Sequence, residues 1–132
     1  MTFVIVVTLL AALMPFFFLA LSGLPAKNAF ARWGPGYDND EPRASLDKLE
    51  GWRKRAHFAQ QNGHEAFAPF AAGVMLATWT HGAFVIPLAS SFLAFRVAHG
   101  LAYIAGSGTW RSAFLWGGFA CVLGLYLSAL MG

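Results

Sequence analysis

The first stretch of the chain, residues 1–26 (MTFVIVVTLLAALMPFFFLALSGLPA), contains no charged side chain, and it decides the class of fold. About 20 consecutive apolar residues are enough to cross the hydrocarbon core of a bilayer as a helix. A secretory signal peptide would place its cations before an apolar core of about 7–15 residues. Here the first cation, Lys27, follows a longer run. We therefore predict a membrane-spanning helix over residues 2–24.

The composition of the whole chain also favours a membrane protein. Of the 132 residues, 58% are hydrophobic and only 11% are charged, whereas soluble domains carry about 25% charged residues. Three further segments rich in apolar residues predict helices over residues 47–79, 84–105 and 110–131, joined by short turns. The predicted fold is an all-α membrane protein, a four-transmembrane-helix bundle that forms a single domain over residues 1–132.

Most cationic side chains lie in the polar loop predicted over residues 25–46 and at the start of the next helix. Seven of the nine Lys and Arg residues fall between Lys27 and Arg55, together with five of the six acids. This mixed-charge segment lacks the basic stripe of a nucleic-acid-binding surface, so we predict no nucleic-acid partner. Because cytoplasmic loops carry an excess of Lys and Arg, we expect the loop in the cytoplasm. Four helices then place both termini on the opposite side.

Two opposite charges lie inside the predicted spans. At 1.5 Å per residue, Arg96 is about 15 Å from the cytoplasmic end of its helix, and Glu65 is about 10–15 Å deep on the preceding helix. An Arg at the bilayer centre costs about 2.5–3.5 kcal/mol on insertion scales, and it needs a partner or water. We predict an ion pair between Glu65 and Arg96, within one subunit or across an interface.

Other polar residues share the helix faces of these two charges. On the helix predicted over residues 47–79, helical spacing places Asn62 on one face and Glu65 at the edge of that face. On the helix predicted over residues 84–105, Arg96, His99 and Tyr103 share one face. The residues alone leave two interpretations open. The polar stripes form either a structural clamp that holds the bundle together or a cleft that water or a ligand fills.

The sequence predicts no metal site and no hydrolase triad. The single cysteine, Cys121, excludes a disulfide within the chain and a multi-cysteine metal site, and its apolar surroundings are typical of a small packing residue. His57 and His64 lie seven residues apart, a spacing poorly suited to chelating one ion. The acids other than Glu65 all lie in or near the first loop, so no Ser-His-Asp set can be built.

Three segments resemble those of the MAPEG family, the membrane-associated proteins of eicosanoid and glutathione metabolism. The pattern RxxxAxxNxxE over residues 55–65, followed by PF at residues 69–70, resembles the signature of the second helix of that family. The stretch RVAHGLAY over residues 96–103 is similar to the third helix of its prostaglandin E synthase branch, and RS at residues 111–112 resembles the pair that opens its fourth helix. The chain thus resembles a bacterial-type member similar to microsomal glutathione transferases and prostaglandin E synthases.

The resemblance implies a homotrimer of four-helix subunits that holds glutathione between neighbours, near the cytoplasmic side. It implies that Arg111, with Ser112 beside it, is catalytic. The cation would stabilise the glutathione thiolate, which then attacks a lipophilic electrophile. The binding residues that the resemblance implies are Asn62, Glu65, Arg96, His99 and Tyr103.

The function implied is therefore a glutathione-dependent membrane enzyme, of transferase or peroxidase type, that acts on small lipophilic electrophiles. The alternative is a non-catalytic trimeric protein that binds membrane lipid or another lipophilic small molecule, because the family also contains a lipid-binding scaffold. Gln61 and Leu115 stand where glutathione-binding members carry Arg and Tyr. Glutathione has two carboxylates, so the missing cation predicts a weaker affinity.

Overall fold

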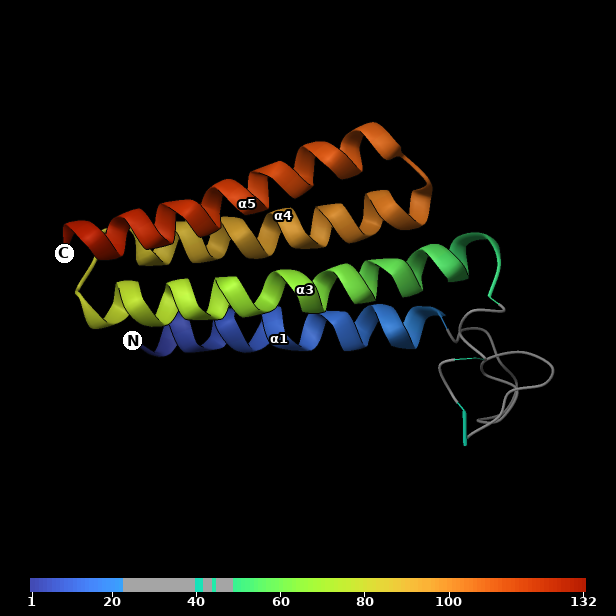
Figure 1. The fold of residues 1–132 in the computed structure, drawn as a ribbon, viewed down its shortest axis with the longest axis horizontal. Coiled ribbons are helices and arrows are strands. Elements are labelled where there is room, and N and C mark those ends of the chain that lie inside the picture. Colours follow the sequence, from blue (N-terminus) through green and yellow to red (C-terminus); the bar gives the residue numbers. More distant parts are fainter. Residues whose placement is uncertain (23–39, 42–43, 45–48) are drawn as a thin grey trace.

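The structure is a computed structural model, and it describes residues 1–22, 40–41, 44 and 49–132. The described residues form four long helices and no strand: α1 (Thr2–Ser22), α3 (Gly51–Trp79), α4 (Val85–Ala105) and α5 (Gly108–Met131). The helices lie side by side along the long axis of the molecule (Figure 1), each antiparallel to the helix that follows it. Both chain ends and the turn between α3 and α4 lie at one end of the bundle. The predicted four-helix fold is confirmed.

The second predicted helix begins later than expected. Glu50 has an extended backbone (φ −128°, ψ 164°), and α3 starts at Gly51 instead of at residue 47. Gly51 has a φ of +60°, a left-handed conformation that glycine adopts readily and that interrupts a regular helix. Residues 23–24 and 47–48, and most of the predicted loop over residues 25–46, lie outside the described residues.

Three of the four helices, α1, α4 and α5, are long and apolar enough to cross a membrane. By contrast, α3 carries Arg53, Lys54, Arg55 and Glu65 in its first half and is apolar over residues 66–79. It nevertheless runs beside α1 along the bundle (Figure 1) and packs against all three other helices. The chain is therefore a helical integral membrane protein whose second predicted span has a polar first half.

The core of the bundle takes buried side chains from all four helices, including Val7 of α1 and Leu125 of α5. The rings of Phe70 and Phe92, both buried, stack in parallel with their centroids 3.9 Å apart. Large apolar side chains also cover the outer faces, since Phe17 on α1 and Trp116 on α5 are both more than half exposed. Outward-facing aromatic residues of this kind suit helices that face lipid or a neighbouring chain.

One close contact fixes α1 against α4 near the middle of the polar stripe. The residue after His99 is Gly100, which is buried, and a Cβ atom there would overlap the ring of Phe18. Phe18 is itself 2% exposed. Glycine is therefore required at this position, next to His99 in the chain, for α1 to approach α4.

Candidate functional site

The buried Arg96 guanidinium is held by an amide from α3. Arg96 lies in the middle of α4 with an exposed fraction of 2%. Its Nη2 donates a hydrogen bond of 2.7 Å to Oδ1 of Asn62. A hydrogen bond with one charged partner is shorter and stronger than a neutral one. The hydrogen bond from Asn62 therefore offsets part of the free-energy cost of burying the Arg96 cation.

The predicted ion pair between Glu65 and Arg96 does not form as a direct contact within the subunit, although the charge of Glu65 still acts on Arg96 electrostatically. Asn62 occupies the bonding position, and Glu65 is exposed. Glu65 follows Asn62 by three residues, so the two side chains point about 60° apart around the helix axis. When Asn62 points at α4, Glu65 therefore points to one side of α4. Matched depth alone did not decide which of the two polar residues would reach Arg96. The variant of the prediction in which the pair forms across an interface stays a prediction.

A cavity of about 250 Å³ opens beside this pair, between α3, α4 and α5. Its polar lining comes from Asn62, Glu65 and Arg96, and its apolar lining includes Phe92 and Leu115. Nε of Arg96 is buried and has no hydrogen-bond partner among the described residues. Buried donors in native proteins are rarely left unpaired, so this N–H is suited to an acceptor from a ligand or a water molecule.

A second polar group continues from Arg96 toward the turn between α4 and α5. The ring of His99, which is 2% exposed, has its Nδ1 2.9 Å from the backbone carbonyl oxygen of Arg111. Because a carbonyl only accepts, Nδ1 carries the proton in this contact. The same ring meets Tyr103 edge to face, with centroids 5.6 Å apart and planes at 79°.

The predicted catalytic cation lies over the face of an aromatic ring. Cζ of Arg111 is 4.8 Å from the centroid of the Tyr103 ring, within the range of a cation–π interaction. Arg111 is partly exposed and Ser112, the next residue, is exposed. One face of the guanidinium therefore rests on Tyr103, while Arg111 remains within reach of a ligand.

One further residue, Arg55, makes a contact that the sequence did not predict. Its Nε donates a hydrogen bond of 2.9 Å to the backbone carbonyl of Ile104, near the end of α4. The last carbonyls of a helix lack partners within it, and Arg55 supplies one. The sequence hinted at a role for Arg55, since Arg55 begins the motif over residues 55–65 that also contains Asn62. It does not indicate which backbone carbonyl of α4 lies opposite Arg55.

The structure thus brings six of the seven predicted site residues to one region. The residues that contact one another are Asn62 and Arg96, and His99, Tyr103 and Arg111. Glu65 lines the cavity beside the first pair without bonding to Arg96. Ser112 is adjacent to Arg111 in the chain.

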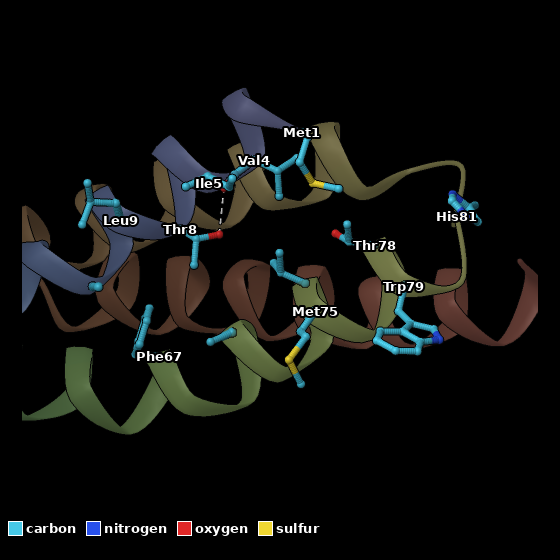
Figure 2. Close-up of a pocket in the computed structure, with 13 residues that line it drawn as sticks. Met1, Val4, Ile5, Thr8, Leu9, Phe67, Met75, Thr78, Trp79 and His81 are labelled. Carbon is cyan, nitrogen blue, oxygen red and sulfur yellow. Dashed lines mark hydrogen bonds between the residues drawn. The ribbon is translucent and has the colours of Figure 1, made fainter.

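A larger groove lies elsewhere in the bundle. A groove of about 680 Å³ runs between α1 and α3 at the end of the bundle that holds the chain termini. Figure 2 shows Leu9, Phe67 and Met75 along it and Thr78 and His81 toward its end. It contains none of the predicted site residues. Chemistry needs charged and hydrogen-bonding groups, so the smaller polar cavity is the better candidate site.

The remaining histidine and cysteine residues do not form a second centre. No group of three His, Cys, Asp or Glu residues in the described part of the chain could hold a metal ion. The exposed His64 ring packs edge to face on Phe16, with centroids 5.3 Å apart. Cys121 is free and buried in α5, in agreement with a packing role.

A helical membrane bundle with a buried, hydrogen-bonded Arg, and with a second Arg on the Tyr103 ring near the start of α5, defines a class. It is the class of polytopic membrane proteins with an intramembrane polar site. The comparison with known families makes the assignment more specific. The model of the MAPEG family matches residues 3–131, nearly the whole chain, and the chain belongs to that family. No curated protein and no solved structure matches the chain.

Proposed function

We propose that the protein binds glutathione at the polar cluster of α3, α4 and α5 and uses it, as a membrane transferase or peroxidase, on small lipophilic electrophiles. The observation that carries the proposal is the pair of cations at this cluster. Arg96 presents a buried N–H without a partner among the described residues, and Arg111 is held on Tyr103 at the more exposed end. Glutathione, with two carboxylates and a thiol, offers anionic groups to both.

The chemistry expected of Arg111 follows from its charge. A nearby cation favours the anionic thiolate over the neutral thiol, and the thiolate is the nucleophile. In a transfer reaction, the sulfur forms a bond to an electrophilic carbon, and the leaving group departs with the bonding electron pair. The guanidinium remains protonated throughout, so Arg111 acts by stabilising charge and not as a base.

A homotrimer is part of the proposal because the site in one subunit is incomplete. Ligand pockets for small molecules usually enclose about 300–1,000 Å³, and the polar cavity encloses about 250 Å³. Glu65 is also exposed, although a carboxylate at membrane depth requires protein or water around it. A neighbouring subunit that covers Glu65 would enlarge the site and supply a partner.

The orientation in the membrane is likewise proposed from charge. Arg53, Lys54 and Arg55 lie in the first turns of α3, at the end of the bundle where α5 begins and where Arg111 lies. By the positive-inside rule, that end faces the cytoplasm. The glutathione site would then open to the compartment that supplies glutathione, and both termini would lie on the opposite side.

One observation favours a second candidate function, the binding of lipid or another hydrophobe without turnover. The groove between α1 and α3 encloses about 680 Å³ and is lined almost entirely by apolar side chains (Figure 2). Such a groove suits an alkyl or aromatic group. No Lys or Arg side chain lines it, and the observation favours binding without turnover.

One experiment separates the two candidates. The protein, purified in detergent, is titrated with glutathione by calorimetry and then assayed with a chloronitroaryl electrophile. We expect saturable heat at up to millimolar glutathione and formation of the thioether product. Absence of both, with retained binding of a fluorescent hydrophobe, would overturn the enzyme proposal in favour of the second candidate.

A further inference from the structure

We propose that Lys54 is a further binding residue of the site: its ammonium group, which lies over the Phe58 ring, binds the glycine carboxylate of glutathione. The inference rests on the proposed function and adds one ligand contact to it. When its thiol is ionised, glutathione carries three anionic groups, namely two carboxylates and the thiolate. Arg96 and Arg111 account for two of these groups, so one carboxylate is left without a cation.

Two neighbouring aromatic rings connect Lys54 to the site. Nζ of Lys54 lies 5.9 Å from the centroid of the Phe58 ring, within the range of a cation–π interaction. The centroid of the Phe58 ring is 6.4 Å from that of Tyr103 on α4, and Tyr103 carries the Arg111 guanidinium. Each ring therefore holds one cation, and the two rings are in contact with each other.

The register of α3 places Lys54 on the side of the helix that carries the polar lining of the cavity. Lys54 and Phe58 are one turn apart, and Glu65 follows Lys54 by eleven residues, so Lys54 and Glu65 point only about 20° apart around the helix axis. Glu65 lines the polar cavity. These three residues therefore form one ridge along α3, with a cation near the start of the helix and an acid beside the cavity.

The other two cations at the start of α3 are engaged elsewhere. Arg55 is bonded to a backbone carbonyl of α4. Arg53 lies over the ring of Trp52, with Cζ 5.8 Å from its centroid, and it precedes Asn62 by nine residues, which points it to the opposite side of α3. Lys54 is exposed and makes no ion pair with an acid among the described residues. Its charge is therefore available to a ligand.

The charges beside the cavity decide which end of glutathione meets Lys54. The γ-glutamyl end carries an ammonium group next to its carboxylate, whereas the glycine end carries a carboxylate alone. Glu65 attracts the ammonium group, and Arg96, which lines the same cavity, offers its unpartnered N–H to the carboxylate next to that group. With the thiolate at Arg111, the glycine carboxylate is the group that remains for Lys54.

The test compares glutathione with glutathione ethyl ester, in which only the glycine carboxylate has lost its charge. Lys54→Gln removes the ammonium group, and Lys54→Arg keeps a cation. The matched control is Arg53→Gln, which removes the adjacent cation from the opposite side of α3. The readouts are the calorimetric Kd for each compound, kcat with the chloronitroaryl electrophile at saturating glutathione, and Tm.

We expect Lys54→Gln to weaken glutathione binding about fivefold, which corresponds to the stronger exposed ion pairs. The change in kcat should be much smaller, because Arg111 still stabilises the thiolate. The wild-type protein should bind the ester about fivefold more weakly than glutathione, and Lys54→Gln should bind the two compounds alike. Lys54→Arg should restore most of the difference, while Arg53→Gln should leave both Kd values and the Tm unchanged.

Several results would overturn the role of Lys54. If Lys54→Gln still binds the ester more weakly than glutathione, another group holds the glycine carboxylate. If Arg53→Gln weakens binding as much as Lys54→Gln does, the effect belongs to the general field at this end of the bundle. An unchanged Kd for glutathione in Lys54→Gln would remove this contact and leave the proposed function standing. A wild-type protein that binds neither compound would refute the proposed function, and the role of Lys54 with it.

Discussion

Replacing Asn62 with alanine removes the acceptor that the buried Arg96 guanidinium holds at 2.7 Å. Nε of Arg96 already has no partner among the described residues, so the variant would leave two guanidinium nitrogens unpaired at 2% exposure. Hydrogen bonds to charged groups contribute about 1.5–3 kcal/mol. We expect a destabilisation of that size.

For a chain of this length, 1 kcal/mol corresponds to about 3–5 °C in Tm, so the expected loss is roughly 5–15 °C. The assay is thermal unfolding in detergent, followed by circular dichroism. The matched control is Gln61→Ala, since Gln61 is the adjacent exposed residue of α3. It should stay within about 0.5 kcal/mol of the wild type.

Two further variants show whether the loss comes from the unpaired cation. Asn62→Asp keeps an acceptor in place and should keep most of the stability. Arg96→Met in an Asn62→Leu background removes both polar groups and should recover much of the loss, as replacement of other buried polar pairs does. An Asn62→Ala variant as stable as Gln61→Ala would refute the reasoning, because another group would then satisfy Arg96.

Three more predictions follow from particular contacts. Arg111→Ala should lower kcat about 10²–10³-fold, with a much smaller effect on the Kd for glutathione measured by calorimetry. The control is Arg53→Ala, which removes another cation at the same end of the bundle and should leave kcat and Kd unchanged. Gly100→Ala should destabilise the fold by about 1–3 kcal/mol, because the added Cβ overlaps Phe18; an unchanged Tm would contradict the close packing of α1 on α4. Gln61→Arg adds a cation beside the polar cluster and should tighten glutathione binding about fivefold; an unchanged Kd would show that no glutathione carboxylate reaches this side of α3.

The fold was predictable because hydrophobic runs and turns determine it. The glycine turn after residue 105 ends α4 at Ala105 as predicted, since Gly106 takes a left-handed φ of +78°. The start of α3 was predicted four residues too early. An amphipathic, charged segment gives no sharp change in hydropathy there, and only the backbone of Glu50 and Gly51 marks the boundary.

The candidate site was predictable in its residues but not in its bonds. Helical spacing placed Arg96, His99 and Tyr103 on one face, and the structure brings them together with Asn62 and Arg111. Spacing gives the direction of a side chain, not the backbone atom opposite it.

Two bonds therefore escaped prediction: those of Arg55 and His99 to carbonyl groups of α4 and α5. The sequence also did not predict that Asn62, and not Glu65, bonds to Arg96. That outcome depends on a difference of about 60° between the directions of the two side chains around the axis of α3.

The central claim is that the polar cluster holds glutathione as a thiolate beside Arg111. The most direct measurement is the ultraviolet difference spectrum of the purified protein on addition of glutathione at neutral pH, with S-methylglutathione as the control. The account predicts a saturable thiolate band with glutathione, none with the methylated compound, and a weaker band in Arg111→Ala. No band at a glutathione concentration that saturates the calorimetric signal would contradict it.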